Sequence, residues 1–356
     1  MHPCHHAAAT PDKAAVIVAE TGAVLSYAAL EAASNRVAHA LRARGLAPDT
    51  RIALLLCNTP EYYALAWGAQ RCGLRFVCIS SKLTAGEVDY ILADSESVLL
   101  FADVRLAETA AALETPIARY SLGGAIAGFA PWEDEVAAMP STRIEGETAG
   151  AAMLYSSGTT GTPKCIVHAT GRVLLQHVKE HQLHSDLAAG DRLLYVTTCG
   201  WMMWNWMVSA LASGVTIVCV DGNVMHPGPE RLWDLVEDHD VDMLGVGAKY
   251  LDALGGVQFS PGQNHDLGSL RTLASTGSPL SPERFQWVYD EVKPDVHLAS
   301  ISGGTDLCSC FVLGDPTSPV YAGEIQRPGL GMAVDVWSEA GESLAVGERG
   351  ELVCTE

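Results

Sequence analysis

The sequence predicts an α/β protein in which layered, parallel-rich sheets are covered by helices on both faces. Continuous apolar runs of strand length recur along the chain, and such runs are typical of strands buried on both sides. Segments with helical periodicity separate them. Of the 356 residues, 48% are hydrophobic and 18% are charged, which is enough apolar surface for a substantial core and excludes global disorder.

The first 120 residues alternate most clearly between helix and strand. Gly45 is placed to end the first helix, Pro60 stands at a helix-opening position, and Thr84 with Glu87 forms a capping box that opens a third helix. The expected elements are a helix that includes 30–41, a strand over 52–56, a helix over 60–73, a strand over 76–79, a helix after 84 and a strand over 98–101.

Beyond residue 120 the pattern weakens into glycine, proline and mixed charge, and it recovers after residue 150. We therefore expect four parts: a first α/β lobe over 1–120, a connector over 121–150, a second α/β lobe over 151–325, and a last section over 326–356 with short antiparallel strands. Within the second lobe we expect strands near 192–198, 215–220, 242–246, 270–274 and 296–301, and helices over 229–238 and after 281–282.

The composition excludes several classes of function. A net charge of −20, without a cluster of Lys and Arg, argues against generic nucleic-acid binding. Several of the ten cysteines lie in apolar runs, which suits free thiols in a reducing compartment, and we expect a cytoplasmic protein. The uncharged stretch 200–220 is long enough to cross a bilayer. Gly214 divides it into a buried helix and a β-branched strand, so we expect no membrane span. The polar residues 2–6 are expected to fray.

The most informative segment is a polar loop that follows an apolar strand at 151–154. Its glycines let backbone N–H groups approach an anion, its hydroxyl groups add donors, and Lys164 adds one positive charge suited to a phosphate oxygen. The spacing is not that of P-loop NTPases. A polar turn between two strands is the alternative for such a composition. The residues that carry the phosphate-loop hypothesis are Ser156, Ser157, Gly158, Thr159, Thr160, Gly161 and Lys164.

This loop resembles the phosphate loop of the adenylate-forming superfamily, which includes acyl-CoA synthetases, luciferases and the adenylation domains of peptide synthetases. Residues 275–280 are similar to the adenine-contacting turn of that family, and residues 300–306 to its Thr-Glu motif, with Asp in place of Glu. The three segments occur in the family's order. The resemblance implies the large N-terminal core of such an enzyme, and it makes 326–356 the beginning of a small β-barrel.

The resemblance also implies a reaction in two halves. A substrate carboxylate attacks the α-phosphorus of ATP to give acyl-adenylate and pyrophosphate, and a thiol, usually that of coenzyme A, then takes the acyl group and expels AMP. The first half needs positioning and charge neutralisation rather than covalent chemistry from the protein. Because both motif loops follow strand ends, they are expected to face one crevice.

Each role is carried over from the family by motif match. Thr305 and Lys164 would serve catalysis, Lys164 with the loop hydroxyls would hold the β- and γ-phosphates, and Asp306 would bind Mg²⁺. From the residues alone, a helix N-cap is the alternative for Asp306. The remaining nucleotide contacts would be Gly277, Ser278, Pro279 and Gly304, with Thr305 at the α-phosphate.

The acid pocket is expected around residues 200–206, where family members have pocket-lining side chains. We assign Trp201, Met203 and Asn205 to it, although a stripe of aromatic and methionine side chains is more often core. Gly303 stands where acetyl-specific relatives have a bulky Trp, so we expect room for a longer acid. Residues 154–351 look most like acetoacetyl-CoA synthetases, which makes a β-keto acid the preferred substrate class.

Two departures from the family leave alternatives open. Residues 10–105 resemble medium- and long-chain acyl-CoA ligases, so the chain looks like a mosaic. The sequence stops at Glu356, before the family's ribose-binding aspartate, hinge and lid lysine, so we expect impaired activity from these residues alone. The alternatives are a catalytically silent nucleotide-binding fragment and a medium-chain acyl-CoA ligase.

Overall fold

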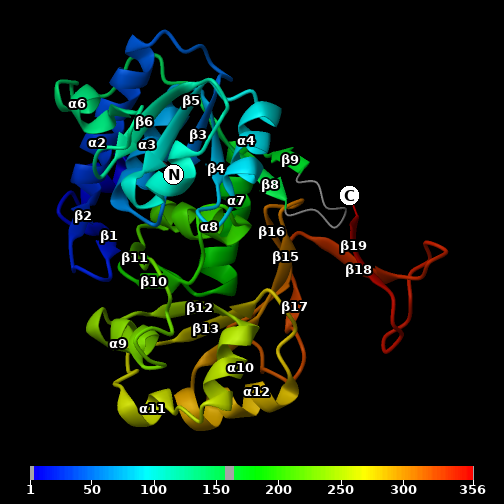
Figure 1. Ribbon diagram of the computed structural model, residues 1–356. Coiled ribbons are helices and arrows are strands. Elements are labelled where there is room, and N and C mark those ends of the chain that lie inside the picture. Colours follow the sequence, from blue (N-terminus) through cyan, green and yellow to red (C-terminus); the bar gives the residue numbers. More distant parts are fainter. Residues whose placement is uncertain (1–3, 157–163, 356) are drawn as a thin grey trace. The chain divides into compact units, whose positions relative to one another are not determined.

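The structure, a computed structural model, describes residues 4–156 and 164–355 of the chain. The chain forms two compact units (Figure 1). Unit 1 comprises Met1–Leu175 and Thr197–Gly222, and unit 2 comprises Gln176–Val196 and Asn223–Glu356. The chain therefore leaves unit 1 after residue 175 and returns to it for one further segment.

The main sheet of unit 1 has seven strands in the described residues: β3 (Arg51–Leu55), β4 (Arg75–Ile79), β5 (Leu99–Asp103), β6 (Ala118–Leu122), β7 (Ala130–Pro131), β8 (Ala151–Ser156) and β9 (Lys164–Val167). Their order is β7-β6-β5-β3-β4-β8-β9. All neighbours run parallel except β8 and β9, which pair antiparallel. The expected parallel-rich sheet is thereby confirmed.

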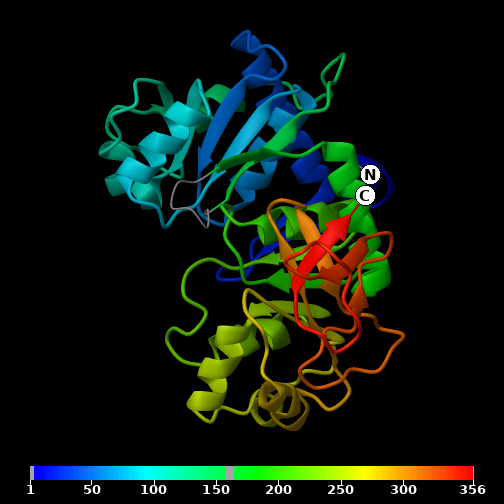
Figure 2. The ribbon, with the colours of Figure 1, turned by 90° about the vertical axis from the view of Figure 1, so that its right-hand side faces the viewer.

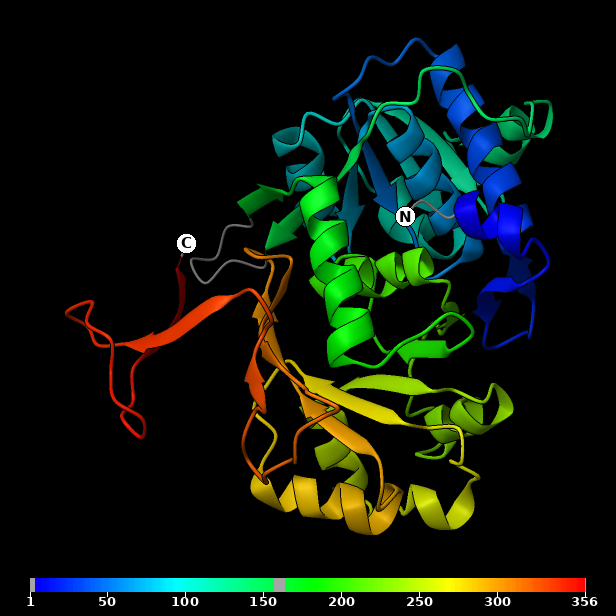
Figure 3. The same ribbon diagram turned by 180° about the vertical axis from the view of Figure 1, so that it is seen from behind.

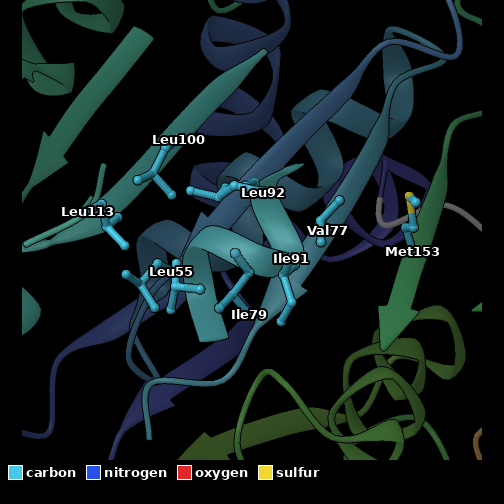
Figure 4. Close-up of a cluster of buried hydrophobic side chains, with 10 residues drawn as sticks. Leu55, Val77, Ile79, Ile91, Leu92, Leu100, Leu113 and Met153 are labelled. Carbon is cyan, nitrogen blue, oxygen red and sulfur yellow. The ribbon is translucent and has the colours of Figure 1, made fainter. Parts of the chain in front are cut away.

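Helices cover both faces of this sheet. On one face α4 (Ala85–Asp94), which begins with the expected capping box, buries Val88, Ile91 and Leu92. These side chains belong to an apolar cluster (Figure 4) whose other members are Ala53, Leu55, Val77, Ile79, Leu100, Leu113 and Met153. Cys78 alternates with cluster residues on β4 and therefore points to the opposite face. There its Sγ lies 2.8 Å from the hydroxyl of Tyr62, on α3 (Pro60–Arg71), which packs against α2 (Tyr27–Ala43).

A second group of strands in unit 1 joins the start of the chain to the returning segment. β1 (Ala14–Val18) pairs parallel with β11 (Thr216–Cys219) and antiparallel with β2 (Val24–Ser26). The returning segment also forms α8 (Met202–Ser209) and the 3₁₀ turn η3 (Ala210–Ser213). Gly214, at φ 75°, separates them from β11 as expected. Among the described residues, no helix combines the length and apolar character needed to cross a membrane.

Unit 2 is built on four parallel strands in the order β14-β13-β12-β10. These are β10 (Arg192–Tyr195), β12 (Met243–Gly247), β13 (Thr272–Thr276) and β14 (His297–Ser300). The unit begins within α7 (Thr170–Lys179), which continues as the π-helical turn η2 (Glu180–His184). Its further helices are α9 (Arg231–Asp238), α10 (Ala248–Gly256), α11 (Pro261–Asn264) and α12 (Pro282–Trp287), the last continuing as η4 (Val288–Val292).

Short antiparallel strands follow β14 in the chain (Figure 2). β15 (Ser302–Gly304), β16 (Ser309–Leu313) and β17 (Arg327–Pro328) form a three-stranded sheet, and β18 (Ala333–Trp337) pairs with β19 (Glu351–Thr355). The antiparallel pairing expected near the end of the sequence is present. Within the described residues these strands form a small sheet and a ribbon, and no closed barrel.

Two segments have more structure than the sequence suggested. Residues 121–150, expected as a connector, contain β7 and α6 (Trp132–Ala137), and β8 beyond them joins the same sheet as β3 to β5. The expectation that residues 2–6 fray was wrong for the residues described. Residues from Cys4 onward form α1 (Cys4–Ala9), where His6 Nε2 lies 3.0 Å from the Ala212 carbonyl oxygen and its ring lies 5.2 Å from that of Tyr27.

Candidate functional site

In unit 1 the expected phosphate loop lies between two paired strand ends. Ser156, the last residue of β8, is opposite Lys164, the first of β9. Ser156 is half-buried and Lys164 is exposed. The preceding Tyr155 donates its hydroxyl hydrogen to Asp94 Oδ2 over 2.7 Å, which fixes the end of β8 to α4. The other predicted loop residues, Ser157, Gly158, Thr159, Thr160 and Gly161, lie outside the described residues.

The expected adenine turn of unit 2 follows β13 directly. Gly277 has φ +84°, a left-handed conformation that other residues rarely adopt, so the turn requires glycine here. Gly277 and Pro279 are exposed and Ser278 is half-buried. Thr276 donates its hydroxyl hydrogen to the Ile301 carbonyl oxygen over 3.1 Å. That bond ties the start of this turn to the chain that leaves the neighbouring strand β14.

Thr305 and Asp306 lie in the turn of a hairpin rather than at a helix N-cap. β15 and β16 pair antiparallel, with Gly304 opposite Ser309, and residues 305–308 make the turn between them. Asp306 is exposed and Thr305 is half-buried. The carboxylate and hydroxyl are thus carried on a short turn that begins five residues after β14 ends.

The structure gives a reason for glycine at position 303 that the sequence did not suggest, while its place in the acid pocket stays a prediction. We expected Gly303 to leave room for a longer acid. A Cβ atom at this position would lie 2.1 Å from the Ser309 carbonyl oxygen and 2.8 Å from Cys310 Cα. Gly303 is therefore needed because β16 passes close beside it, and Gly303→Trp would push the two strands apart. A Cβ at the adjacent Gly304 would meet no atom nearer than 3.8 Å.

The three expected acid-pocket residues of unit 1 differ in exposure. Trp201 precedes α8 and is 59% exposed, whereas Met203 is 8% exposed. Asn205 is half-buried overall, but its Nδ2 atom is buried and has no hydrogen-bond partner among the described residues. Trp204, which we did not assign to the pocket, is buried against Tyr62 with ring centroids 5.1 Å apart. The aromatic and methionine residues of 201–206 thus divide into core residues and candidate pocket residues.

The sequence analysis missed a set of buried polar residues beneath the Thr305–Asp306 hairpin. His177, Glu180, His181 and His184, which we call the polar stripe, are all buried. Glu180 Oε1 accepts hydrogen bonds from Ser309 Oγ at 2.5 Å and from the Cys310 backbone N–H at 3.3 Å. The signal that could have revealed them is the helical spacing i, i+3, i+4, i+7, which was occupied by polar residues and so not counted as a buried face.

Cys4, Cys165 and Cys354 are half-buried, and the other seven cysteines are buried. The structure describes all ten, and none of them forms a disulfide bond. Burial raises the pKa of the Cys78 and Cys219 thiols to about 12, which disfavours the reactive thiolate. In the described part of the chain, no group of three or more His, Cys, Asp or Glu side chains is arranged to hold a metal ion. Magnesium would therefore need ligands from bound phosphate and water besides Asp306.

Comparison with known proteins gives concordant matches. The profile of the family described as AMP-binding enzyme matches residues 4–356. The acetoacetyl-coenzyme A synthetase of Rhizobium meliloti (strain 1021) is 42% identical over 362 residues, covering 93% of this chain and 54% of that protein. The acetoacetyl-CoA synthetase of Mus musculus is 52% identical over 204 residues, covering 57% of this chain and 30% of its own. The solved structure of acetoacetyl-CoA synthetase from Streptomyces lividans has a TM-score of 0.89 and 33% identity, covering 99% of this chain and 58% of that chain.

The chain spans about half the length of the curated Rhizobium relative. Because that match covers 93% of the chain, it includes most of residues 10–105, whereas the mouse match covers 57%. The mosaic interpretation stays a prediction. The family profile extends over almost the whole sequence, and the fold is that of the N-terminal part of adenylate-forming enzymes. Together with the three ordered motifs, these findings establish that this chain belongs to the AMP-binding enzyme family.

Proposed function

We propose that this chain binds ATP with Mg²⁺ and a short carboxylic acid, acetoacetate or a similar β-keto acid, and forms the acyl-adenylate. Coenzyme A would be the thiol acceptor of the second half-reaction. The observation that carries the proposal is the turn between β15 and β16, which carries both Thr305 and the exposed Asp306. This turn lies within the residues that match the family profile. The acid class rests on the relatives, which are acetoacetyl-CoA synthetases.

The proposed nucleotide contacts come from three segments of the chain. In unit 1, Lys164 and Ser156 flank the loop 157–163, and this loop would hold the β- and γ-phosphates with backbone N–H groups and hydroxyls. In unit 2, Thr305 would contact the α-phosphate. The left-handed Gly277 turn, with Ser278 and Pro279, would lie against adenine, and Gly304 against the nucleotide. These roles position the reactants and offset phosphate charge, which is most of what adenylation needs from protein.

Asp306 is the residue that would hold magnesium. Its carboxylate is exposed on the hairpin turn, and carboxylate oxygen is a ligand type that Mg²⁺ prefers. A bound Mg²⁺ neutralises charge on phosphate oxygens. The protein's own part is to present one carboxylate at a fixed place on the turn.

Asn205 supports the choice of a β-keto acid. Its buried Nδ2 atom lacks a hydrogen-bond partner among the described residues, and such a donor is costly unless a ligand satisfies it. A keto oxygen can accept that hydrogen bond, whereas a methylene group cannot. Trp201 and Met203 would provide the apolar part of the pocket. We expect Asn205→Leu to lower the preference for acetoacetate over butyrate about tenfold, in keeping with one lost hydrogen bond.

Titration calorimetry tests binding, and carboxylate-dependent exchange of labelled pyrophosphate into ATP tests adenylation. We expect Mg-ATP, AMP and a non-hydrolysable acetoacetyl-adenylate analogue to bind below millimolar concentration, and Lys164→Ala to weaken Mg-ATP far more than AMP. If none of the three ligands binds, the nucleotide assignment is wrong. Binding without exchange for any acid from two to six carbons would instead favour a silent nucleotide-binding protein.

A further inference from the structure

The polar stripe occupies a helix face that is normally apolar. Residues at spacing i, i+3, i+4 and i+7 share one face of a helix, and in this protein they are His177, Glu180, His181 and His184. Glu180 and both His177 and His181 are 0% exposed, and His184 is 2% exposed. Burial of such groups costs free energy unless each finds hydrogen-bond partners. If this helix face served only to fill the core, aliphatic side chains would do so at a lower free-energy cost of burial.

The stripe makes hydrogen bonds at the start of β16 and just beyond its end, and β16 lies beside this helix in unit 2 (Figure 3). His177 Nε2 lies 2.5 Å from the Cys308 carbonyl oxygen, and His184 Nδ1 lies 2.8 Å from that of Gly314. Since a carbonyl can only accept, both of these ring nitrogens carry the hydrogen. His184 Nε2 then accepts from the Leu330 backbone N–H at 3.1 Å. Glu180 bonds Ser309 and Cys310 between these two ends.

One end of the stripe reaches the turn that carries Thr305 and Asp306. The Cys308 backbone N–H bonds the Thr305 carbonyl oxygen at 3.1 Å, and Cys308 has φ 51°, an uncommon value for a residue other than glycine. His177 holds the carbonyl of this same residue. Ser309 and Cys310, which Glu180 holds, are the register partners of Gly304 and Gly303. The helix thus holds the start of β16 by hydrogen bonds, and β16 in turn holds β15 on the other side of the turn by strand pairing.

Two neighbouring side chains, Gln176 and Lys179, extend this network behind the Glu180 carboxylate. Gln176 Nε2 donates to Glu180 Oε1 over 2.9 Å and lies 2.9 Å from Ser309 Oγ. Gln176 Oε1 in turn accepts from Lys179 Nζ at 3.0 Å, and Lys179 also donates to the Leu330 carbonyl oxygen. The network is directional, so it fixes where β16 lies along the helix as well as how closely it packs.

We propose that Glu180 and His177 are positioning residues for adenylation, which set the place of the Thr305–Asp306 turn through β16. The proposal rests on the function proposed above, because it assigns the turn to ATP and magnesium. A displacement of about 1 Å at reacting groups can cost 100-fold in rate. Partners that orient metal ligands from behind typically change affinity or activity about 10–100-fold when removed.

The test compares two positions in the same stripe, Glu180 near the turn and His184 at the far end. Glu180→Ala removes the contact beneath the turn, Glu180→Gln keeps an acceptor oxygen there, and His184→Ala removes an equally buried contact at the far end of β16. We expect Glu180→Ala to raise the Mg²⁺ concentration needed for half-maximal acetoacetate-dependent pyrophosphate exchange about 10–100-fold, with the acid KM unchanged. Glu180→Gln should restore most of this loss. His184→Ala should lower the melting temperature but leave the magnesium dependence as it was.

Amide hydrogen exchange of residues 302–310 gives a readout that needs no activity. It should accelerate in Glu180→Ala but not in His184→Ala. If the unsubstituted protein shows no exchange of pyrophosphate with any acid, the proposed function fails, and this second measurement still decides whether the stripe positions the turn. Ser309→Ala, which removes one donor to the carboxylate, replaces Glu180→Ala if that variant does not fold. Equal magnesium dependence in the Glu180 and His184 variants, or equal amide exchange where activity is absent, would overturn the proposal.

Discussion

The contacts made by α4 and by residues 176–184 differ in chemistry although both seat a helix on strands. α4 meets the main sheet of unit 1 through Val88, Ile91 and Leu92, which join an apolar cluster. Residues 176–184 meet β16 of unit 2 through Gln176 and the polar stripe. Apolar contact is roughly proportional to area and has no direction, whereas hydrogen bonds require particular atoms at particular angles. We infer that the first contact supplies stability and the second fixes position, and the following substitutions test that division.

The largest loss of stability is expected in the apolar cluster. Leu92 is 1% exposed there, and Leu92→Ala would remove buried methyl groups and leave a cavity. Such substitutions lower the free energy of unfolding by about 2–5 kcal/mol. Leu92→Met, which conserves volume, should cost less than about 1.5 kcal/mol. Denaturant unfolding at several pH values gives both numbers, and they should not depend on pH. If both substitutions lowered the free energy of unfolding by a similar amount, the cluster would depend on the exact shape of its side chains. It would then be as specific as the polar contact.

The next effect depends on pH because it concerns a buried carboxylate at the far end of β16. Asp315 accepts hydrogen bonds from the Thr317 and Ser318 hydroxyls and from Arg327, and these hold its pKa well below the usual range. Its stabilising contribution is therefore present above the unfolded-state pKa of about 3.9 and is lost as the pH falls through the folded-state value. Asp315→Asn should cost about 1.5–3 kcal/mol at pH 7.

The control for this prediction is Asp295→Asn, since Asp295 is exposed at the surface of the same unit. The difference between the Asp315 variant and the unsubstituted protein should shrink as the pH is lowered below about 4. A difference that stays constant with pH would show that the amide loses packing rather than charge-assisted bonds.

A pair of adjacent glycines tests the close approach of β15 to β16. Gly303→Ala would place its Cβ against the Ser309 carbonyl oxygen and should cost about 1–3 kcal/mol, as overpacking does. Gly304→Ala would make only ordinary van der Waals contact, with Asp306 Oδ2 at 3.8 Å, and should change stability by less than about 0.5 kcal/mol. Thermal unfolding distinguishes the two variants. If Gly303→Ala is neutral, then β16 can move away, and the hairpin is less firmly held than its hydrogen bonds imply.

The smallest effect concerns a hydrogen-bonded part of α4, its N-terminal cap. Thr84 and Glu87 bond one another across the first turn. Thr84→Ala should lower the free energy of unfolding by about 1 kcal/mol, and Thr84→Ser should restore most of it. An effect as large as that of Leu92→Ala would show that α4 depends on its cap more than on its buried face.

The sequence predicted the apolar parts of this fold well and the polar parts poorly. β3, β4 and β5 lie within one or two residues of their expected positions because their apolar runs permit few alternatives. β6 was missed because Arg119 and Ser121 interrupt the apolar residues of its sequence, ARYSL. The local pattern of hydrophobic residues predicts an element well when its buried side chains are apolar, because the type of each residue then indicates whether it is buried.

The candidate site shows the same limit. The turn at 277–279 could be located because its residues resemble a family motif, which is a local property, and its contact with adenine stays a prediction. The roles of Gly303 and of the polar stripe depend on β16, which lies more than 100 residues beyond the stripe in sequence. Histidine and glutamate at helical spacing are typical of a solvated face, and only their distant partners identify them as buried. The loop 157–163 remains a prediction from its residues alone.

The return of the chain to unit 1 bears on the order in which a ribosome could complete this fold. Tyr27 donates its hydroxyl hydrogen to the Val215 carbonyl oxygen, and Asn58 donates to the carbonyl oxygens of Thr197 and Val220. Until residues 197–220 have emerged, β1 lacks its partner β11, and the two donors lack these acceptors. Residues 176–196, synthesised in between, must wait longer still for β12 and β16. Neither unit can therefore close during synthesis before part of the other has been made, so a pause near residue 175 would expose an incomplete sheet edge to other nascent chains.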